Sequence, residues 1–396
     1  MNKMSRRAFL GAGAAAGLSL ALPMAAADDF DPSYERASVR LFQDMYSSMA
    51  RDKNVVLAPG AVLGAVLQPA VGAVRGSASE RAVQELFGSS ADLTVIGNRF
   101  LRTFGSLMNV TAKGALLKQN VEMWISRDVR VSGDFVQRYK AAFGGTPVTG
   151  FDFKSRAQAM QSINRWASDS TDGKIPQLLR NPLPGDTAFA AGGATYFKAP
   201  WVTAFDPSLT RDADFTVEGR TIPVSMMYAH GMKGKYIESA SFTYAAIAFE
   251  GEFEFFAIKP SGSLDKTVTD LSSVLLEIRR ADAFPQSLTI QLPRLDLATQ
   301  DDLTESLQSG VLGPLMKGQD LSGIGGGVEH IDAGVQATMF RIDEKGGEAA
   351  AVAVVSGSKG IQFNREFTLD RDAVVGIARR GNPIFLVALR SPTGPN

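Results

Sequence analysis

The sequence predicts an α+β fold, and two patterns carry this prediction. Apolar residues recur at helical spacing through much of the first half of the chain, whereas strand-like stretches dominate the second half. The connections between the expected strands are too varied for a regular alternation of strands and helices, which disfavours a doubly wound parallel sheet. The chain has 396 residues, 45% of them hydrophobic, and no linker-like stretch divides it. We therefore expect one domain with a large core.

Start and stop signals place the helices. Asp31 and Pro32 open a helix, because proline is tolerated in the first turn, where its missing N–H costs nothing. Ser77 and Glu80 form a capping box ahead of an apolar run, and Gly88 follows where that helix would stop. Further helices are predicted at 134–143, 155–170, 271–280 and 301–309, with one from Pro59 that is interrupted near Pro69.

The strands are predicted from β-type alternation and from short apolar runs that end at turn residues. A break at Glu250 and Gly251 divides one long stretch, 243–259, into two strands. The other strands are expected at 54–58, 121–126, 187–198, 287–299 and 335–344.

Residues 1–27 have the pattern of a targeting segment. Residues 5–10 read SRRAFL, which matches the twin-arginine signal, and an apolar run and a small-residue cleavage site at 25–27 follow. The run from 8 to 22 is shorter than the roughly 20 residues that a membrane-spanning helix needs. We therefore expect a bacterial protein, exported through the twin-arginine route to the periplasm or beyond, with residues 28–396 as the mature domain.

Composition excludes several kinds of chemistry. The chain has no cysteine, which excludes disulfides, thiolate metal sites and cysteine nucleophiles. Its 41 basic and 41 acidic residues cancel, so nothing points to nucleic acid or to an anionic membrane. His230 and His330 lie near no nucleophile motif, and no third ligand at metal spacing accompanies His330 and Asp332. The glycines at 323–327 lack the lysine of a phosphate loop. We expect no catalytic residue, no cofactor and no metal.

One segment stands apart, residues 341–360, which read RIDEKGGEAAAVAVVSGSKG. If this segment is a strand, Gly347 and the alanines at 349, 351 and 353 lie on one face, which therefore carries no side chain larger than a methyl group. Such a strand could slide between two others without overpacking the core beneath them. Consecutive alanines have poor intrinsic strand preference, and the same run is compatible with an ordinary buried helix or strand.

The segment DEKGGEAAAVAVV resembles the reactive-loop hinge of the serpins, the serine protease inhibitor family. The tail from Asp370 to Pro392 is similar to the paired C-terminal strands of that family, so the likeness runs from about Pro32 to Pro392. Four further blocks resemble serpin blocks in serpin order: Ile163 to Ile175, Ala194 to Thr210, Gln291 to Thr299 and Asp320 to Ile324.

The resemblance implies three β-sheets, about eight or nine α-helices and an exposed reactive loop at about 344–362. It implies a suicide inhibitor that a serine protease, or a cysteine protease as a second class of target, attacks to form a covalent acyl complex. The cleaved loop would then insert into the main sheet. The chain would be a monomer with no nucleic-acid partner and, after signal removal, no membrane partner. The alternative is a non-inhibitory binding or chaperone-like protein with the same fold.

The resemblance also assigns site residues. The bond cut would lie at Lys359, Gly360 or Ile361, and the sequence leaves these three open. Arg294 and Trp201 would lie at the top of the main sheet, where Arg294 pairs with Glu344 as a latch; a plain surface ion pair is the alternative. The hinge that inserts first would comprise Glu344, Gly346, Gly347, Glu348, Ala349, Ala350 and Ala351.

Two departures from the family pattern concern insertion. Gly347 stands where the family usually has threonine or serine, and glycine in a strand costs conformational entropy. A polar cluster expected beneath the main sheet is replaced, with Ala58, Gly60, Gly193 and Gln336 at its positions. Because these positions differ together, we expect no buried polar group to lose its partner.

Overall fold

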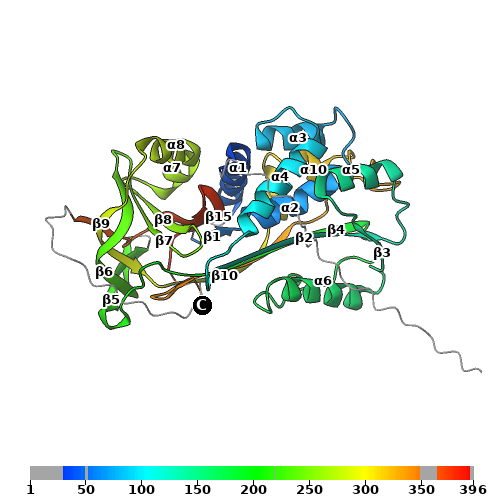
Figure 1. Cartoon of the computed structure of the whole chain (residues 1–396). Coiled ribbons are helices and arrows are strands. Elements are labelled where there is room, and N and C mark those ends of the chain that lie inside the picture. Colours follow the sequence, from blue (N-terminus) through cyan, green and yellow to red (C-terminus); the bar gives the residue numbers. More distant parts are fainter. Residues whose placement is uncertain (1–29, 50–51, 218, 348–363, 393–396) are drawn as a thin grey trace, which may run out of the picture.

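The computed structural model describes residues 30–49, 52–217, 219–347 and 364–392. The expected signal segment and most of the expected reactive loop, including the three candidate cleavage residues, lie outside these ranges. Among the described residues the fold is α+β, as predicted (Figure 1).

The described residues form ten α-helices and one 3-10 helix, rather than about eight or nine helices. The predicted start and stop signals hold: Asp31 Oδ1 accepts from Ser33 N, and Ser77 Oγ accepts from Glu80 N. Gly88 ends its helix with a left-handed φ of 59°. The helices are α1 (Pro32–Ser48), α2 (Pro59–Ala70), α3 (Ala78–Phe87), α4 (Leu93–Met108), α5 (Gly133–Phe143), α6 (Arg156–Ser170), η1 (Pro207–Leu209), α7 (Leu264–Thr269), α8 (Leu271–Ala281), α9 (Thr304–Ser309) and α10 (Gly313–Lys317).

The strands form three sheets, as the resemblance implied. The largest has the order β1-β15-β14-β8-β7-β6-β9-β13, with β5 paired to β6. Its strands are β1 (Val55–Leu57), β5 (Arg211–Val217), β6 (Arg220–Glu238), β7 (Phe242–Ala248), β8 (Phe253–Pro260), β9 (Gln286–Pro293), β13 (Arg365–Thr368), β14 (Ala373–Arg379) and β15 (Asn382–Leu389).

The other two sheets position the candidate site. One has the order β12-β4-β2-β3 and the other pairs β10 with β11. Their strands are β2 (Leu116–Ser126), β3 (Val148–Phe151), β4 (Phe189–Pro200), β10 (Leu295–Asp302), β11 (Val335–Ile342) and β12 (Gly346–Gly347). In Figure 1, α2 and α4 lie over one face of the long strands β2 and β4, and α6 lies over the opposite face.

Two sequence-based boundaries were wrong. The single strand expected at 287–299 is two strands, β9 and β10, which belong to different sheets and meet at Arg294. The N–H of Arg294 donates to Ser225 O of β6, so the chain changes its hydrogen-bond partners at this residue. Asp301 and Asp302, expected at a helix start, lie at the end of β10 instead.

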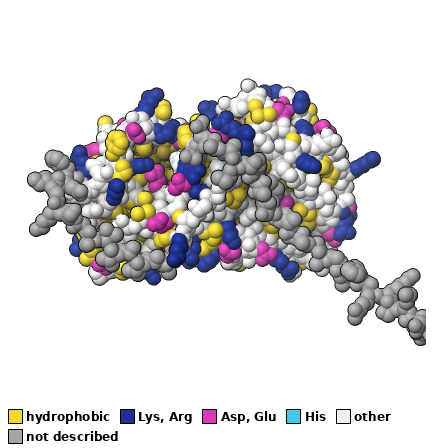
Figure 2. Space-filling model, in the orientation of Figure 1, with side chains coloured by type: hydrophobic (Ala, Val, Ile, Leu, Met, Phe, Trp, Pro, Cys, Tyr) yellow, Lys and Arg dark blue, Asp and Glu magenta, His cyan; other side chains and the backbone are white. Residues whose placement is uncertain are grey.

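The C-terminal strands lie in the core. Every residue of β14 and β15 is buried, and β15 lies between β1 and β14 while β14 pairs with β8. Within the described ranges, no helix is both long and apolar enough to cross a membrane. Figure 2 shows basic and acidic side chains interspersed over the visible face, in keeping with the formal net charge of zero.

Candidate functional site

The candidate site is a break in the sheet system between β4 and β11. The described ladders join β4 to β2 on one side and β11 to β10 on the other, but they do not join β4 to β11. At the upper end, the two residues of β12 pair antiparallel with β4, Gly346 opposite Pro200 and Gly347 opposite Ala199. The chain that leaves β11 therefore turns back and starts down the edge of β4.

A tight turn at 343–346 makes this reversal. Asp343 N donates to Gly346 O at 3.0 Å, and the Asp343 carboxylate accepts from Lys345 N at 2.8 Å. Gly346 has a φ of +128°, and a Cβ there would lie 2.3 Å from Ala199 O. Glycine at this position therefore has a physical cause: the backbone of β4 approaches closely, and φ is positive.

Gly347 is constrained by its neighbour rather than by its own backbone. A Cβ on Gly347 would lie 2.6 Å from the ring of Phe197. That ring packs edge-on against Phe249 and Phe253, with centroid distances of 5.4 and 5.0 Å, so it has little room to move. The departure from threonine or serine thus fits the space that this sheet provides.

Trp201 supports the turn from the end of β4. Its Nε1–H donates to Asp343 O at 2.8 Å, and its ring stacks on Phe249 with the centroids 3.8 Å apart. The backbone N–H of Trp201 also donates to Lys345 O. These contacts place Trp201 beside the turn at 343–346, directly after the end of β4.

Arg294 and Glu344 are in direct contact. Arg294 donates to the carboxylate of Glu344 from Nη2 at 2.7 Å and from Nε at 2.9 Å, and Thr210 Oγ1 donates at 2.5 Å. Burial opposes ionisation of Glu344, but the hydrogen bonds from Arg294 and Thr210 outweigh it and lower the pKa of the carboxyl group. The same hydrogen bond raises the pKa of Arg294. The pair is therefore charged at neutral pH.

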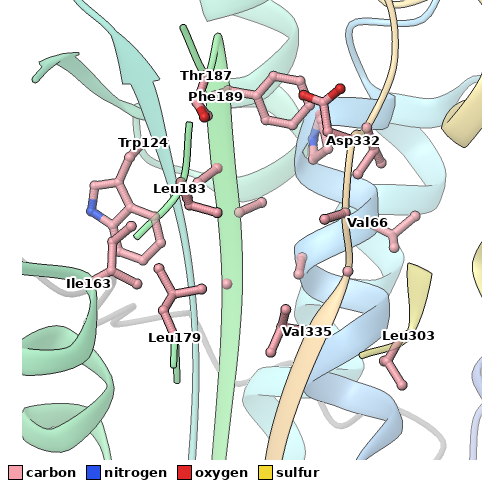
Figure 3. A pocket seen from close by; sticks show the side chains of 18 of the residues that line it. Val66, Trp124, Ile163, Leu179, Leu183, Thr187, Phe189, Leu303, Asp332 and Val335 are labelled. Carbon is pink, nitrogen blue, oxygen red and sulfur yellow. The ribbon is translucent and has the colours of Figure 1, made fainter. Parts of the chain in front are cut away.

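Below the turn, the break opens into a cavity of about 630 Å³. Its walls are mostly apolar and come from α2, β4, β11, α9 and the region that α6 covers. In Figure 3, β4 runs between Trp124 and Ile163 on one side and Val66 and Val335 on the other. Three exposed carboxylates, Asp186, Glu329 and Asp332, lie on its lining, which contains no lysine or arginine.

Gln336 replaces part of the expected polar cluster beneath the sheet. Its amide accepts from Ala58 N at 2.9 Å and donates to Val56 O at 2.7 Å, which ties β11 to the start of α2. Gly193 lies against α2, where a Cβ would be 2.2 Å from Ala61 O.

The prediction that no buried polar group lacks a partner was wrong at one atom of this region. A Cβ on Gly60 would lie 2.7 Å from Gln119 Nε2, so the glutamine side chain fills that space. The Oε1 of Gln119 is buried with no hydrogen-bond partner among the described residues.

The structure thus gathers part of the predicted site. Glu344, Gly346, Gly347, Arg294 and Trp201 meet at the top of β4. The other predicted residues lie outside the described ranges: Glu348, Ala349, Ala350, Ala351, Lys359, Gly360 and Ile361.

The two histidines are placed separately. His230 Nδ1 lies 2.8 Å from Thr289 Oγ1, and His330 Nε2 lies 3.3 Å from Asp332. Within the described ranges, no three His, Cys, Asp or Glu side chains are grouped closely enough to hold a metal ion.

Two contributors to the site were not predicted. Thr210, the third partner of Glu344, ends a block that resembles the family, but nothing in the sequence indicates its hydroxyl contact. Phe197 lies in a predicted strand, yet its role in limiting position 347 depends on pairing between segments about 150 residues apart.

Known proteins share this architecture. The family model described as "Serpin (serine protease inhibitor)" matches residues 32–389. Alpha-2-antiplasmin of Bos taurus is 25% identical over 367 residues, which cover 90% of this chain and 72% of that protein. Intracellular coagulation inhibitor 1 of Tachypleus tridentatus is 28% identical over 295 residues, which cover 71% of this chain and 70% of that protein.

A solved structure supports the same assignment at the level of the fold. Human thyroxine-binding globulin complexed with thyroxine matches with a TM-score of 0.78 and 21% identity, covering 91% of this chain and 98% of that one. The family match spans nearly all of the described residues and includes every element around the break between β4 and β11. The chain therefore belongs to the serpin family.

Proposed function

We propose that this protein inhibits a serine protease as a suicide substrate, with the cleaved loop inserting between β4 and β11. One observation carries the proposal: the hinge has already turned back and paired with the upper end of β4, and a cavity lies farther down the same strand, where residues 189–193 line it. Insertion of a serpin reactive loop into a sheet is a recognised case of strand addition.

The break offers enough unpaired strand to drive insertion. Below the pair at Ala199, β4 presents ten further residues, 189–198, and β11 offers a second edge. At roughly 1 kcal/mol net per hydrogen bond, an inserted strand would gain on the order of 10 kcal/mol. The intact inhibitor with its loop outside the sheet is then less stable than the inserted form. A kinetic barrier must therefore keep the uncut loop out.

The chemistry belongs to the protease. Its serine oxygen attacks the carbonyl carbon before the cut bond, the C–N bond breaks, and the released amine takes up a proton. The inhibitor remains attached through its acyl group, while the segment N-terminal to the cut is freed to insert. In this proposal the chain supplies the substrate bond and the sheet, and no catalytic residue.

The location proposed for this activity is outside the cytoplasm, and residues 28–396 would act there as one domain. The SRRAFL motif and the small residues at 25–27 support twin-arginine export. Replacing Arg6 and Arg7 by lysine should retain the protein in the cytoplasm of a bacterial host. Export of that variant at the normal level would contradict this route.

The test of inhibition uses the full mature chain and a panel of serine proteases, with one cysteine protease of the papain type. We expect an adduct that survives denaturing electrophoresis, and a C-terminal fragment separated from it under the same conditions. The cut inhibitor should also melt roughly 10 °C or more above the intact one, because an extra strand has been added. Cleavage without an adduct would favour the non-inhibitory binding protein instead, and an unchanged melting temperature would contradict insertion itself.

A further inference from the structure

The cavity beside β4 has the size and the lining of a small-molecule site. Its volume of about 630 Å³ lies within the range of roughly 300–1,000 Å³ that is typical of such sites. Val62 and Val66 of α2 line it on one side of β4, and Trp124 and Ile163 line it on the other (Figure 3). An apolar lining that faces empty space lacks van der Waals partners, so a ligand that fills this cavity would gain those contacts.

Small side chains leave this space open. The part of β4 that lines the cavity includes Ala190, Ala191, Gly192 and Gly193. On α2, every residue is buried except Ala65, which is partly exposed and lines the cavity. A larger side chain at position 65 would therefore extend into the cavity and compete with a ligand for the same volume.

The charged groups on the lining are acidic. Asp186, Glu329 and Asp332 are exposed, and the described lining contains no lysine or arginine. Figure 3 shows Asp332 and Thr187, the neighbour of Asp186, toward one end of the cavity and Leu179 toward the other. Carboxylates beside an otherwise apolar site attract a cation and repel an anion. The cavity therefore favours a ligand with an apolar body and a positive charge at one end.

The lining also offers hydrogen-bond acceptors. His330 Nε2 lies 3.3 Å from Asp332 Oδ1, so the neutral ring donates from Nε2 and leaves Nδ1 as an acceptor. This Nδ1 is buried and has no hydrogen-bond partner among the described residues. On β4, Ala188 O accepts from β2, and peptide groups alternate in direction along a strand, so those of Phe189 and Ala191 face the break. A ligand with N–H donors suits these acceptors.

We propose that this cavity binds a small apolar molecule that carries one amine. The apolar part lies in the break between β4 and β11, and the ammonium group lies among Asp186, Glu329 and Asp332. This site goes beyond the proposed function, because binding requires neither a protease nor cleavage of the chain. The tests below use intact protein alone, so their failure would leave the inhibitory function untouched.

The first experiment compares three fluorescent probes that differ only at one end. Each carries a dansyl ring on a five-carbon chain, which ends in an ammonium group (dansylcadaverine), in a methyl group or in a carboxylate. Each probe is titrated with the intact mature chain, and the rise in dansyl fluorescence measures binding. We expect the ammonium probe to bind with a dissociation constant of about 1–100 μM and at least about tenfold more tightly than the carboxylate probe, with the neutral probe between them.

Two results of this comparison would overturn the proposal. Equal affinity of the ammonium and carboxylate probes, or a reversed order, would contradict the preference for an amine. Absence of binding by all three probes would contradict the site itself.

The second experiment tests the location. Ala65→Phe places a ring in the cavity and should weaken binding of the ammonium probe at least about tenfold, because the ring excludes several ligand atoms. Ala65→Leu is a smaller filling that serves if phenylalanine prevents folding, and it should weaken binding about threefold. Ala141→Phe, at an exposed alanine of α5, is the matched control. Unchanged affinity in a folded Ala65 variant, or equal weakening in the control, would overturn the assignment to this cavity.

The third experiment tests the charge. Three substitutions made together neutralise the lining carboxylates: Asp186→Asn, Glu329→Gln and Asp332→Asn. We expect the preference for the ammonium probe over the carboxylate probe to fall to about twofold or less, while the affinity for the neutral probe stays the same.

The matched control neutralises as many exposed carboxylates in the largest sheet: Asp212→Asn, Asp214→Asn and Glu366→Gln. The control should keep the preference of the wild type. A preference that survives in the lining variant, or that falls equally in the control, would overturn the placement of the ammonium group.

Discussion

Arg294 binds the carboxylate of Glu344 through two of its nitrogen atoms, Nη2 at 2.7 Å and Nε at 2.9 and 3.1 Å. The two side chains differ in exposure: the Glu344 side chain is 7% exposed, and that of Arg294 is 50% exposed. Such a pair differs from a plain surface ion pair, because the nearly buried Glu344 carboxylate cannot regain full hydration when Arg294 is removed. Glu344 is also the second residue of the turn at 343–346 that reverses the chain into β12, so the pair holds the start of the hinge.

Replacement of Arg294 by alanine tests the latch. The nearly buried Glu344 carboxylate would keep Thr210 as a donor but lose its cation, at a cost of about 1–3 kcal/mol. The turn should loosen, and the cut loop should insert less promptly. We expect the stoichiometry of inhibition to rise, with more inhibitor cleaved for each protease molecule trapped. Titration of protease activity against inhibitor measures this ratio.

Arg294→Lys is the matched control, since it keeps the charge but not the two-nitrogen contact, and it should fall between wild type and alanine. The pKa of Glu344 is lowered from its ordinary value of 4.5, so the contribution of the pair is present above that pH and is lost in acid. Wild type and Arg294→Ala should therefore converge in stability as the pH falls through the lowered pKa of Glu344, below its ordinary value of 4.5. Equal stoichiometry at neutral pH would discard the latch.

Gly347→Ala addresses the glycine at the hinge. Alanine normally suits a strand better than glycine, but here its Cβ would lie 2.6 Å from the Phe197 ring. Because Phe249 and Phe253 hold that ring, we expect the substitution to push the hinge away from β4 and to reduce the fraction of protease trapped. The double variant with Phe197→Leu should recover part of the loss. An increase in trapping by Gly347→Ala alone would show that backbone entropy outweighs the contact.

The helices and strands with local signals could be predicted from the sequence. The N-cap at Ser77 and the stop at Gly88 are confirmed, since they depend on residues within one turn of each other. The second half of the predicted capping box is not formed, because the Glu80 carboxylate accepts from Gly76 N and not from Ser77 N. Helix α4 was not predicted, although Leu93, Ile96 and Phe100 carry a helical spacing that was available in the sequence. The division between β9 and β10 had no such signal, because it depends on a bond from Arg294 to another strand.

The candidate site could be predicted only through resemblance. Arg294 and Glu344 are 50 residues apart, and no local pattern brings them together. The break between β4 and β11 exists because no hydrogen-bonded ladder joins these two strands among the described residues. Which strands pair depends on contacts between segments far apart in the sequence, so no local pattern reveals the break. Gln336 illustrates the same limit, since its two backbone partners, Ala58 and Val56, lie 278 and 280 residues away.

The fate of the C-terminal fragment is a further prediction. Strands β14 and β15 are buried throughout and lie between β1 and β8, so they should anchor the C-terminal fragment in the core after the chain is cut. We expect the fragment to co-elute with the rest of the inhibitor in size-exclusion chromatography under native conditions and to separate in denaturant. Separation without denaturant would mean that cleavage dismantles the largest sheet.

Glu122 gives the structure a pH dependence away from the hinge. It lies on β2 between Asn120, which donates to Ser170 O, and Trp124, which packs edge-on against Trp166, so α6 covers it. Burial raises its pKa to about 7, while a 3.4 Å hydrogen bond from Met123 N opposes the shift only weakly. A raised folded-state pKa means that the unfolded chain loses this proton at lower pH. Stability should therefore fall as pH rises from about 4.5 to about 7.

Glu122→Gln replaces the ionisable carboxyl group with a neutral amide of nearly the same shape. We expect the variant to be more stable than wild type at pH 8, by on the order of 2–3 kcal/mol, and nearly equal to it at pH 4, where the wild-type carboxyl is neutral. Thermal unfolding of both proteins across this range measures the difference. Glu366→Gln, a change at an exposed residue of β13, should alter stability little at either pH. A gain for Glu122→Gln that is the same at pH 4 and pH 8 would mean that packing, and not ionisation of the buried carboxyl, sets its effect.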